Sequence, residues 1–468
     1  MSASIVWFRN DLRLADNPAL IAALESGQPV VPVYVLDEET HGVRAPGAAS
    51  LWWLHHSLLS LDASLRKLGS RLILRRGAAE TALADLAAAC GATSIHWNRA
   101  YEPGARERDT RLKQAFRQRG AIAQSHKASL LFEPWEVTTQ AGQPFKVFTP
   151  FWRACRALPP AGAPLPAPKV LSAPPAWPAS DALDDWKLLP TAPDWAGGLR
   201  ASWTPGEAAA ARRLTDFLDA TLPRYRQARD LPAVEGTSRL SPHLAFGEIG
   251  PRQIWRAASG LDPSAAVEKF LAELGWREFA YHLLFHFGDL AQRNFRPEFD
   301  GFPWQDSGDA LGAWRRGRTG YPIVDAGLRE LWTTGWMHNR VRMIVASFLT
   351  KDLLIDWRHG ERWFWDTLVD ADPASNATGW QWVAGSGADA APYFRVFNPV
   401  LQGEKFDPAG DYVRRWIPEL ARLPAETIHR PWTAPRPPPP EIYPAPIVDP
   451  AAARARALAA FQTIKRSA

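Results

Sequence analysis

The chain has 468 residues, of which 46% are hydrophobic and 22% charged, a balance typical of soluble globular proteins rather than disordered or fibrous ones. Its 54 lysines and arginines against 49 acids give a formal net charge of +5, which permits a nucleic-acid partner. No apolar run reaches the roughly 18 residues that span a bilayer, and the first residues lack the pattern of a secretory signal. We therefore expect a cytoplasmic protein that does not insert into membranes.

Two residue types are used in unusual numbers. Only two cysteines occur, Cys90 and Cys155, and they do not form a C-x-x-C pair, so we expect neither a disulfide framework nor a metal site. The 23 tryptophans are many, and a buried indole N–H needs a hydrogen-bond partner. This number calls for a reason beyond filling the core.

The first 130 residues alternate short apolar runs with longer helical patterns. We expect strands at residues 5–8, 30–36, 71–74 and 94–97, and helices at residues 17–24, 51–68, 78–90 and 105–117. Such alternation predicts βαβ units, and therefore an α/β domain with a Rossmann-like parallel sheet.

Two proline-rich segments divide the rest of the chain. Residues 158–178 hold 8 prolines in 21 positions, which predicts an extended crossover, and residues 431–450 hold 9 in 20, which predicts an irregular strap before a short terminal helix. Between them the strand pattern disappears and helical stripes dominate. We expect an α/β domain over residues 1–130, a crossover over 131–205, an all-helical domain over 206–430, and the strap with its helix over 431–468.

Several common motifs can be set aside. Residues 385–390 fit the G-x-G-x-x-A form of a dinucleotide fingerprint, but no strand precedes them. The chain has no P-loop and no G-x-S-x-G nucleophile elbow, so kinase and hydrolase interpretations lose their usual support.

One helical stripe combines charged and aromatic groups. Helical spacing places Phe270, Glu273, Trp276 and Arg277 along one face, because residues three and four apart are neighbours. The alternative is a surface Glu–Arg pair beside a core tryptophan, and this helix alone favours that alternative.

Two later segments show a similar mixture. The stripe Trp336, Asn339, Arg340 and Met343 mixes apolar and hydrogen-bonding groups, which ordinary amphipathic helices separate. Residues 370–382 combine two acids, an amide and two indoles, which equally fit a helix cap followed by a core segment.

An upstream region has features of an anion site. Residues 236–242 offer hydroxyls and backbone N–H groups at a predicted helix start, where a phosphate or a plain N-cap is possible. Residues 211–256 hold 8 arginines against 5 acids, which suits a phosphate-tracking rim as well as a solvated face.

Seven segments together resemble the DNA photolyase/cryptochrome family, and most closely its bacterial class I-like enzymes for cyclobutane pyrimidine dimers. They are residues 6–20, 235–249, 276–279, 320–343, 351–368, 379–382 and 389–407. The resemblance implies a helical domain that holds FAD in a U shape below a cleft for UV-damaged DNA. Light excites the reduced FAD, an electron passes to the dimer, the cyclobutane ring splits, and the electron returns. The activity implied is that of a carbon–carbon lyase.

The same resemblance implies the FAD contacts. Tyr225 and residues 237–241 would hold the phosphates and neighbouring groups, and Asn376 would lie beside flavin N5 and support reduced anionic FAD. The full set implied is Tyr225, Thr237, Ser238, Arg239, Leu240, Ser241, Phe270, Arg277, Asn339, Arg342, Asp370, Asp372 and Asn376.

Contacts to the lesion are also implied. Glu273 would hydrogen-bond the dimer in a protonated or proton-sharing state, because a bare carboxylate opposes the arriving electron. The damaged bases would leave the duplex stack to reach the flavin. The set is Arg229, Glu273, Trp276, Arg277, Asn339, Arg340, Met343 and Trp382, in which Trp276 and Trp382 form apolar walls and Arg229 and Arg340 hold flanking phosphates.

Three further tryptophans match the family's electron-transfer chain. Trp380, Trp357 and Trp304 would relay electrons between the protein surface and oxidised FAD, in an order implied by the resemblance. The alternative is that they are three ordinary core tryptophans. This explains why they would be buried, but not why all three match positions of the family's electron-transfer chain.

Two departures from family patterns bear on the lesion type and on the second pigment. Enzymes for (6-4) photoproducts carry a His pair where this chain has Asn339 and Met343, and Met does not titrate, so cyclobutane dimers are favoured over (6-4) photoproducts. A cryptochrome-like photoreceptor without repair is the other alternative. Folate-binding relatives carry an Asn–Glu pair where Gly104 and Ala105 stand. A deazaflavin, FMN, a folate or an empty antenna site all stay open, and we expect a monomer.

Overall fold

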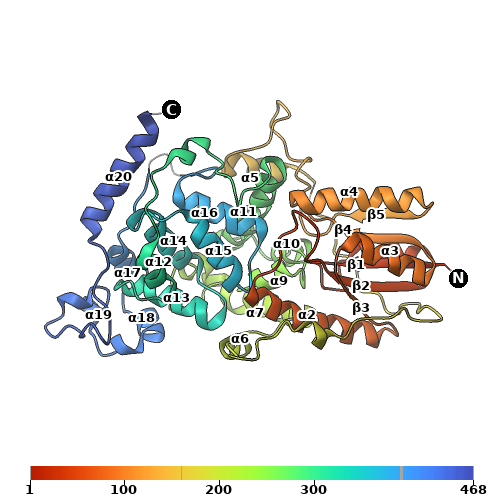
Figure 1. Ribbon diagram of the computed structural model, residues 1–468, viewed down its shortest axis with the longest axis horizontal. Coiled ribbons are helices and arrows are strands. Elements are labelled where there is room, and N and C mark those ends of the chain that lie inside the picture. The colour runs from red at the N-terminus through yellow and green to blue at the C-terminus, as the bar shows by residue number, and fades with distance from the viewer. Residues whose placement is uncertain (1, 160, 391–393, 467–468) are drawn as a thin grey trace. The chain divides into compact units, whose positions relative to one another are not determined.

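The structure is a computed structural model that describes residues 2–159, 161–390 and 394–466. Residue 160 of the predicted crossover, residues 391–393 of the last family segment, and residues 1 and 467–468 lie outside the described residues. Backbone contacts divide the chain into two units, whose helices and strands are labelled in Figure 1. Unit 1 comprises residues 1–196, 203–220 and 238–289, and unit 2 comprises residues 197–202, 221–237 and 290–468.

Unit 1 contains a five-stranded sheet in which every strand is parallel to its neighbours. The strands are β1 (Ala3–Phe8), β2 (Val30–Leu36), β3 (Ile73–Arg76), β4 (Ala92–Asn98) and β5 (Ile122–His126), in the order β3-β2-β1-β4-β5. In register, Ile5 of β1 lies beside Val31 of β2 and Ile95 of β4. The predicted α/β domain is confirmed, with β3 two residues later than expected and β5 not predicted.

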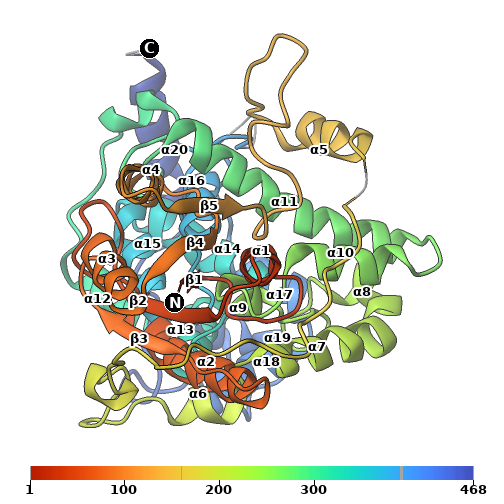
Figure 2. The ribbon, with the colours of Figure 1, turned by 90° about the vertical axis from the view of Figure 1, so that its right-hand side faces the viewer.

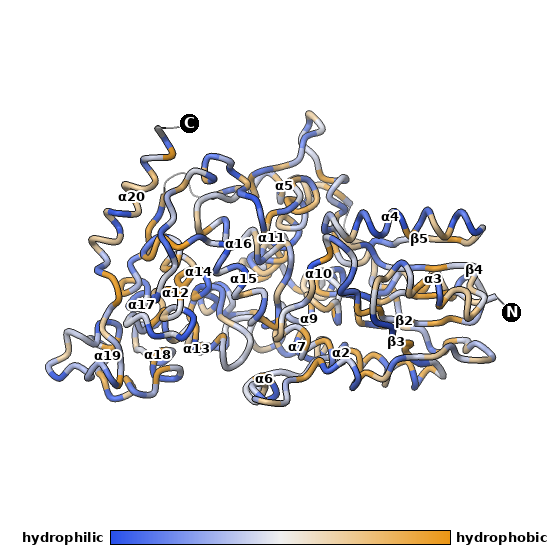
Figure 3. The backbone as a smooth tube through the Cα atoms, viewed as in Figure 1, coloured by the Kyte–Doolittle hydropathy of each residue, from blue (hydrophilic) through white to orange (hydrophobic). Residues whose placement is uncertain are grey.

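Helices of the crossovers cover both faces of this sheet. They are α1 (Pro18–Glu25), α2 (Ala48–Lys67), α3 (Ala79–Cys90) and α4 (Pro103–Gln118). Leu83 of α3 and Phe116 of α4 share one apolar cluster with Ile5 and Trp7 of the sheet, so α3 and α4 lie on the same face, as Figure 2 shows. The outer side of α4 is polar, and the helix is predominantly blue in Figure 3.

The remaining α-helices of unit 1 follow the sheet in sequence. They are α5 (Phe148–Ala157), α7 (Glu207–Asp216), α9 (Ser241–Ala245), α10 (Pro251–Ser259) and α11 (Ala265–Phe287). Residues 161–178 of the proline-rich crossover form neither helix nor strand, as predicted.

Unit 2 is helical, and its described residues form no strand, which confirms the predicted helical part. Its helices are α6 (Gly197–Ser202), α8 (Tyr225–Ala228), α12 (Gly308–Arg315), α13 (Pro322–Thr334), α14 (Asn339–Ser347), α15 (Trp357–Thr367), α16 (Pro373–Ala384), α17 (Pro399–Phe406), α18 (Asp411–Trp416), α19 (Ala425–Ile428) and α20 (Pro450–Arg466). The apolar core joins α12 to α18 and contains Trp314, Trp357 and Trp380. Among the described helices, none is long and apolar enough to cross a membrane.

Candidate functional site

The predicted site residues are divided between the two units. Unit 1 holds Ser238, Arg239, Leu240, Ser241, Phe270, Glu273, Trp276 and Arg277. Unit 2 holds Tyr225, Arg229, Thr237, Trp304, Asn339, Arg340, Arg342, Met343, Trp357, Asp370, Asp372, Asn376, Trp380 and Trp382.

Arg342 and Asp370 form a two-pronged ion pair in unit 2. Arg342 Nη2 lies 3.0 Å from Asp370 Oδ1 and 2.8 Å from Oδ2, and its Nε donates to the carbonyl oxygen of Met337 at 2.7 Å. The Asp370 carboxylate is buried, and such charge-assisted pairs fix both side chains in orientation. Two predicted FAD contacts are therefore brought together here.

Helix α16 begins at a capping aspartate. Asp372 Oδ1 accepts hydrogen bonds from the backbone N–H groups of Ala374 and Ser375, at 3.0 and 2.6 Å. The structure thus confirms the helix cap that residues 370–382 suggested, and the cap fixes the start of the helix that carries Asn376.

One turn into α16, the amide of Asn376 is held by Glu361 of α15. Asn376 Nδ2 donates to the backbone carbonyl oxygen of Glu361 at 3.0 Å and to its Oε1 at 2.8 Å. A carbonyl oxygen can only accept, so the amide nitrogen must face Glu361. The Asn376 Oδ1 atom is left as an acceptor, and no donor from the described residues bonds to it.

Helix α14 presents several predicted residues and starts later than its sequence pattern indicated. His338 precedes the helix, and its Nδ1 accepts from the backbone N–H of Arg340 at 3.2 Å. Because the helix begins at Asn339, Trp336 lies outside it, and the expected helical stripe joining Trp336 to Met343 is wrong. Burial lowers the pKa of His338 to about 4, so its ring is neutral and can accept.

Asp230 connects the two predicted phosphate-binding arginines. Its Oδ1 lies 3.1 Å from Arg340 Nη2 and 3.9 Å from Arg229 Nε. Met343 Sδ lies 3.8 Å from Arg340 Nη1, and the Arg229 guanidinium lies 5.6 Å from the ring centre of Tyr225. Two arginines, Met343 and Tyr225 of unit 2 thus form one group with a single acid, Asp230.

The predicted electron-transfer tryptophans lie in or against one apolar core. Trp380 and Trp357 are buried members of it, while Trp304 is partly buried and also packs against the cluster that includes Phe302. Trp357 Nε1 donates to Asn294 Oδ1 at 2.9 Å. Their common cluster agrees with both the relay and the core interpretation.

Trp382 is two residues beyond Trp380 and is only partly buried. Its Nε1 donates to the carbonyl oxygen of Asp389 at 3.0 Å, which fixes the indole of this predicted lesion wall. Gln381 between them accepts from Phe295 N–H and donates to the carbonyl oxygens of Leu290 and Arg293, so it anchors the segment that precedes Trp304.

In unit 1, α11 carries the other predicted stripe. Phe270 is buried with its ring centre 4.7 Å from that of Phe217. Glu273 Oε1 lies 2.9 Å from Lys269 Nζ, one turn earlier. The structure therefore gives Glu273 an ammonium partner on the same helix, and its contact to the lesion stays a prediction.

The next two residues of the stripe have partners inside unit 1. Trp276 stacks on Phe148 of α5 with ring centres 3.8 Å apart and planes 9° apart, so one face of its indole is covered. Arg277 Nη1 donates to the carbonyl oxygen of Ser129 at 2.8 Å and lies 3.4 Å from Glu278 Oε1. These partners hold Arg277 at the start of the segment after β5.

The segment 237–241 leads into the short helix α9. Arg239 has a φ of 50°, an uncommon value for a side-chain-bearing residue, and its guanidinium lies 4.6 Å from the ring centre of Trp203. Leu240 N–H donates to Ser238 Oγ at 3.4 Å. The helix begins at Ser241, where the sequence predicted a helix start.

The departure at Gly104 has a steric cause. A Cβ atom at Gly104 would lie 2.2 Å from the carbonyl oxygen of Gly42. An asparagine cannot stand there without moving that loop, so these residues do not fit a folate bound through the Asn–Glu pair.

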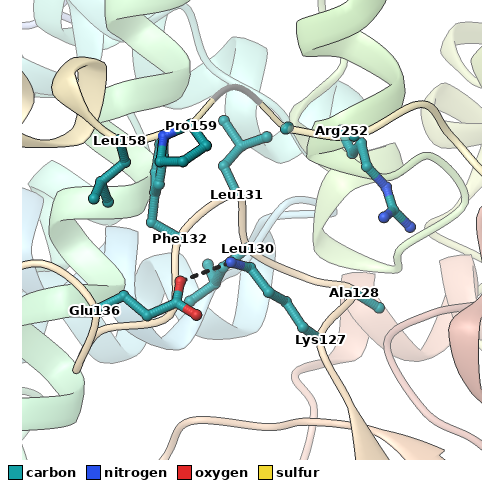
Figure 4. A pocket seen from close by; sticks show the side chains of 11 residues that line it. Lys127, Ala128, Leu130, Leu131, Phe132, Glu136, Leu158, Pro159 and Arg252 are labelled. Carbon is teal, nitrogen blue, oxygen red and sulfur yellow. Dashed lines mark hydrogen bonds and ion pairs between the residues drawn. The ribbon is translucent and has the colours of Figure 1, made fainter.

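Unit 1 also contains a pocket of about 440 Å³ that holds none of the predicted FAD or lesion residues. Leu130, Leu131 and Phe132 line it, and Lys127 and Glu136 pair at 2.8 Å on its side (Figure 4). Nothing in its lining identifies a second pigment.

Sequence reasoning missed the residues that hold the site residues in place. Glu361, Asp230, His338 and Lys269 each contact a predicted residue. Only Lys269 had a local signal, because it stands four positions before Glu273.

Comparison with known proteins identifies the family. A family model described as "DNA photolyase" matches residues 4–169, and one described as "FAD binding domain of DNA photolyase" matches residues 270–463. The chain is 54% identical to a deoxyribodipyrimidine photo-lyase of Agrobacterium fabrum, over 99% of this chain and 98% of the relative. The chain belongs to the DNA photolyase/cryptochrome family.

Within this family, the chain is similar to proteins of both named kinds. A crystal structure titled as a bacterial class III photolyase from Agrobacterium tumefaciens matches with a TM-score of 0.96 and 53% identity, covering 100% of this chain and 98% of that one. The sequence analysis had likened the chain to class I enzymes. Cryptochrome-1 of Arabidopsis thaliana is 42% identical over 92% of this chain and 65% of its own length.

Proposed function

We propose that this protein uses FAD and light to split cyclobutane pyrimidine dimers in DNA. The observation that carries the proposal is the FAD-type set in unit 2, in which the Arg342–Asp370 pair and the Asn376 amide are held in fixed orientations. The likeness of nearly the whole chain to a relative named deoxyribodipyrimidine photo-lyase supports it.

The donor set fits a flavin. Arg342 and Asp370 offer a cation and a carboxylate to the isoalloxazine and ribityl parts, and Asn376 offers an acceptor oxygen. Tyr225, Thr237 and Ser238 to Ser241 supply hydroxyl and N–H groups suited to phosphates. FAD, when bound, supplies the light absorption and the transferred electron, while the chain contributes binding, orientation and electrostatics.

Arginines, tryptophans and one acid are the residues proposed to contact the lesion. Arg229 and Arg340 would bind the flanking phosphates, and Asp230 holds Arg340 ready for that contact. Trp276 and Trp382 would contact the dimer, Phe148 backing the first indole. Glu273 would hydrogen-bond the dimer, and the Lys269 ammonium beside it would offset negative charge that arrives there.

Met343 supports cyclobutane dimers over (6-4) photoproducts as the lesion. Chemistry on (6-4) photoproducts needs proton transfer, and a thioether beside Arg340 holds no transferable proton. We therefore propose DNA with cyclobutane dimers as the partner, and a monomer acting in the cytoplasm.

A second candidate is a photoreceptor without repair, which the 42% identity to Cryptochrome-1 favours. The two functions separate in one experiment. The purified protein with reduced FAD is mixed with an oligonucleotide that carries a thymine dimer, and remaining dimers are counted after light and after darkness. Repair predicts loss in light only, whereas an unchanged dimer count in light would reject the enzyme.

A further inference from the structure

We propose that Glu361 is a positioning residue that turns the Asn376 amide so that its oxygen faces the flavin edge and stabilises reduced FAD. This inference rests on the proposed function, because it assumes FAD beside Asn376. It concerns a residue to which neither the family resemblance nor the comparisons give a role.

The geometry leaves the amide one orientation. Both N–H bonds of Asn376 Nδ2 are directed at Glu361, one to its backbone carbonyl oxygen at 3.0 Å and one to Oε1 at 2.8 Å. An amide that turned by 180° would place its oxygen against two acceptors and lose both bonds. Glu361 is only 2% exposed and Asn376 9%, so water does not readily replace either bond.

The two contacts come from different parts of Glu361. The backbone contact belongs to helix α15 and survives any substitution, whereas the contact to Oε1 depends on the side chain. Removing the carboxyl leaves one buried N–H without its partner and weakens the preference for this orientation.

The orientation matters for the redox state of the cofactor. Reduced FAD carries a hydrogen at N5 and oxidised FAD does not, so an acceptor oxygen at that edge favours the reduced form. A turned amide would present a donor instead. The proposal assigns the effect of Glu361 on the cofactor to its contact with Asn376, and therefore predicts coupling between the two residues.

The test measures how fast reduced FAD bound to the protein re-oxidises in air in the dark, followed by FAD absorbance. Glu361→Leu is expected to re-oxidise about 2- to 10-fold faster than the unchanged protein, the factor that a hydrogen bond of about 0.5–1.5 kcal/mol supplies. Glu361→Gln keeps an acceptor oxygen and should stay within about twofold of the unchanged protein. Should Glu361→Leu fail to retain FAD, Glu361→Asp replaces it, because its shorter side chain withdraws the acceptor.

A double-mutant cycle tests whether Glu361 acts through Asn376. In an Asn376→Leu background, Glu361→Leu should cause no further acceleration. The control is Asp325→Asn, a buried carboxyl of unit 2 whose partners are Thr319, Gly320 and Tyr443, and it should leave the rate within about twofold.

Three results would overturn the proposal: an unchanged rate in the Glu361 variant, failure of Glu361→Gln to restore it, or a full effect of Glu361→Leu without Asn376. Each of these results leaves the proposed function standing as long as the wild-type protein binds FAD and repairs dimers. Failure of the proposed function would instead appear in the wild-type protein, as absence of FAD uptake or of repair.

Discussion

At the scale of single residues, Gly360 has no room for a side chain. A Cβ atom there would lie 2.1 Å from Cη2 of Trp380. We expect Gly360→Ala to displace that indole, to destabilise the protein by about 1–3 kcal/mol and to slow photoreduction of oxidised FAD. Urea unfolding and the rate of FAD photoreduction with an external reductant measure the two effects.

Gly379 provides the matched control. It lies within helix α16, one residue before Trp380, and a Cβ atom there would meet nothing within 4 Å. Gly379→Ala should be neutral or stabilising by up to about 1 kcal/mol. Equal urea midpoints for the two variants would show that Gly360 is not needed for the packing of Trp380.

Glu273 tests the contact to the lesion. Glu273→Ala removes the carboxyl that would hydrogen-bond the dimer, and we expect the repair yield to fall about tenfold or more while FAD stays bound. Lys269→Gln keeps that carboxyl and removes only its ammonium partner, so its loss should be smaller. Repair yield per absorbed photon and FAD content are measured together, and an unchanged yield in Glu273→Ala would remove its assigned role.

The site residues and their supports differ in how far sequence could predict them. Arg342 lies within a family segment and Asp370 and Asn376 lie between two of them, and all three were named from the resemblance that these segments carry. Glu361 stands 15 positions before Asn376 on another helix, and only the packing of α15 against α16 brings their side chains together. No local pattern encodes that contact.

At the scale of elements, helix α14 depends on an unusual cap. The neutral ring of His338 accepts from Arg340 N–H, and the helix then presents Asn339, Arg340, Arg342 and Met343. We expect His338→Ala to cost about 1 kcal/mol or more and to weaken FAD retention, because the helix start loosens. His338→Asn supplies another capping acceptor and should recover most of the loss. Urea midpoints and FAD content measure these effects. Equal midpoints and equal FAD content for the two variants would contradict the capping role.

Strands were predictable where they carry large buried apolar residues. The strands β1, β2 and β4 were located to within two residues at each end, because β1 and β2 hold nearly continuous apolar runs and β4 holds Ile95 and Trp97. Strand β5 reads Ile-Ala-Gln-Ser-His and lies at an edge with only Ala123 of its five residues buried, so its sequence carried no such apolar stretch. Helix α14 was misjudged for a different reason: nothing in its pattern distinguishes a capping histidine from a helical one.

At the scale of the whole molecule, acidification changes the stability of the fold in opposite directions through three histidines and through the buried acid Glu278. Burial lowers the pKa values of His126, His282 and His338 to about 4, so acidification from about pH 6.5 towards 4 costs stability as the unfolded chain takes up protons first. Burial raises the pKa of Glu278 to about 7, so the folded state takes up that proton first and gains stability between about pH 7 and 4.5.

This opposition gives a test. Glu278→Gln removes the gain on acidification but keeps an acceptor for the backbone N–H groups of Leu131 and Phe132. Relative to the unchanged protein, the variant should therefore lose up to about 3 kcal/mol of unfolding free energy between pH 8 and pH 4.5. Urea unfolding at both values measures the difference, and an equal difference at the two pH values would refute the titration of Glu278.

The central claim is that FAD held by this chain splits the dimer when it absorbs light. The most direct measurement removes FAD from the purified protein, adds it back in reduced form, and counts thymine dimers in an oligonucleotide before and after illumination. We predict no repair without FAD, and repair restored by FAD in light but not in darkness. Repair by the FAD-free protein, or none after FAD has rebound, would contradict the account.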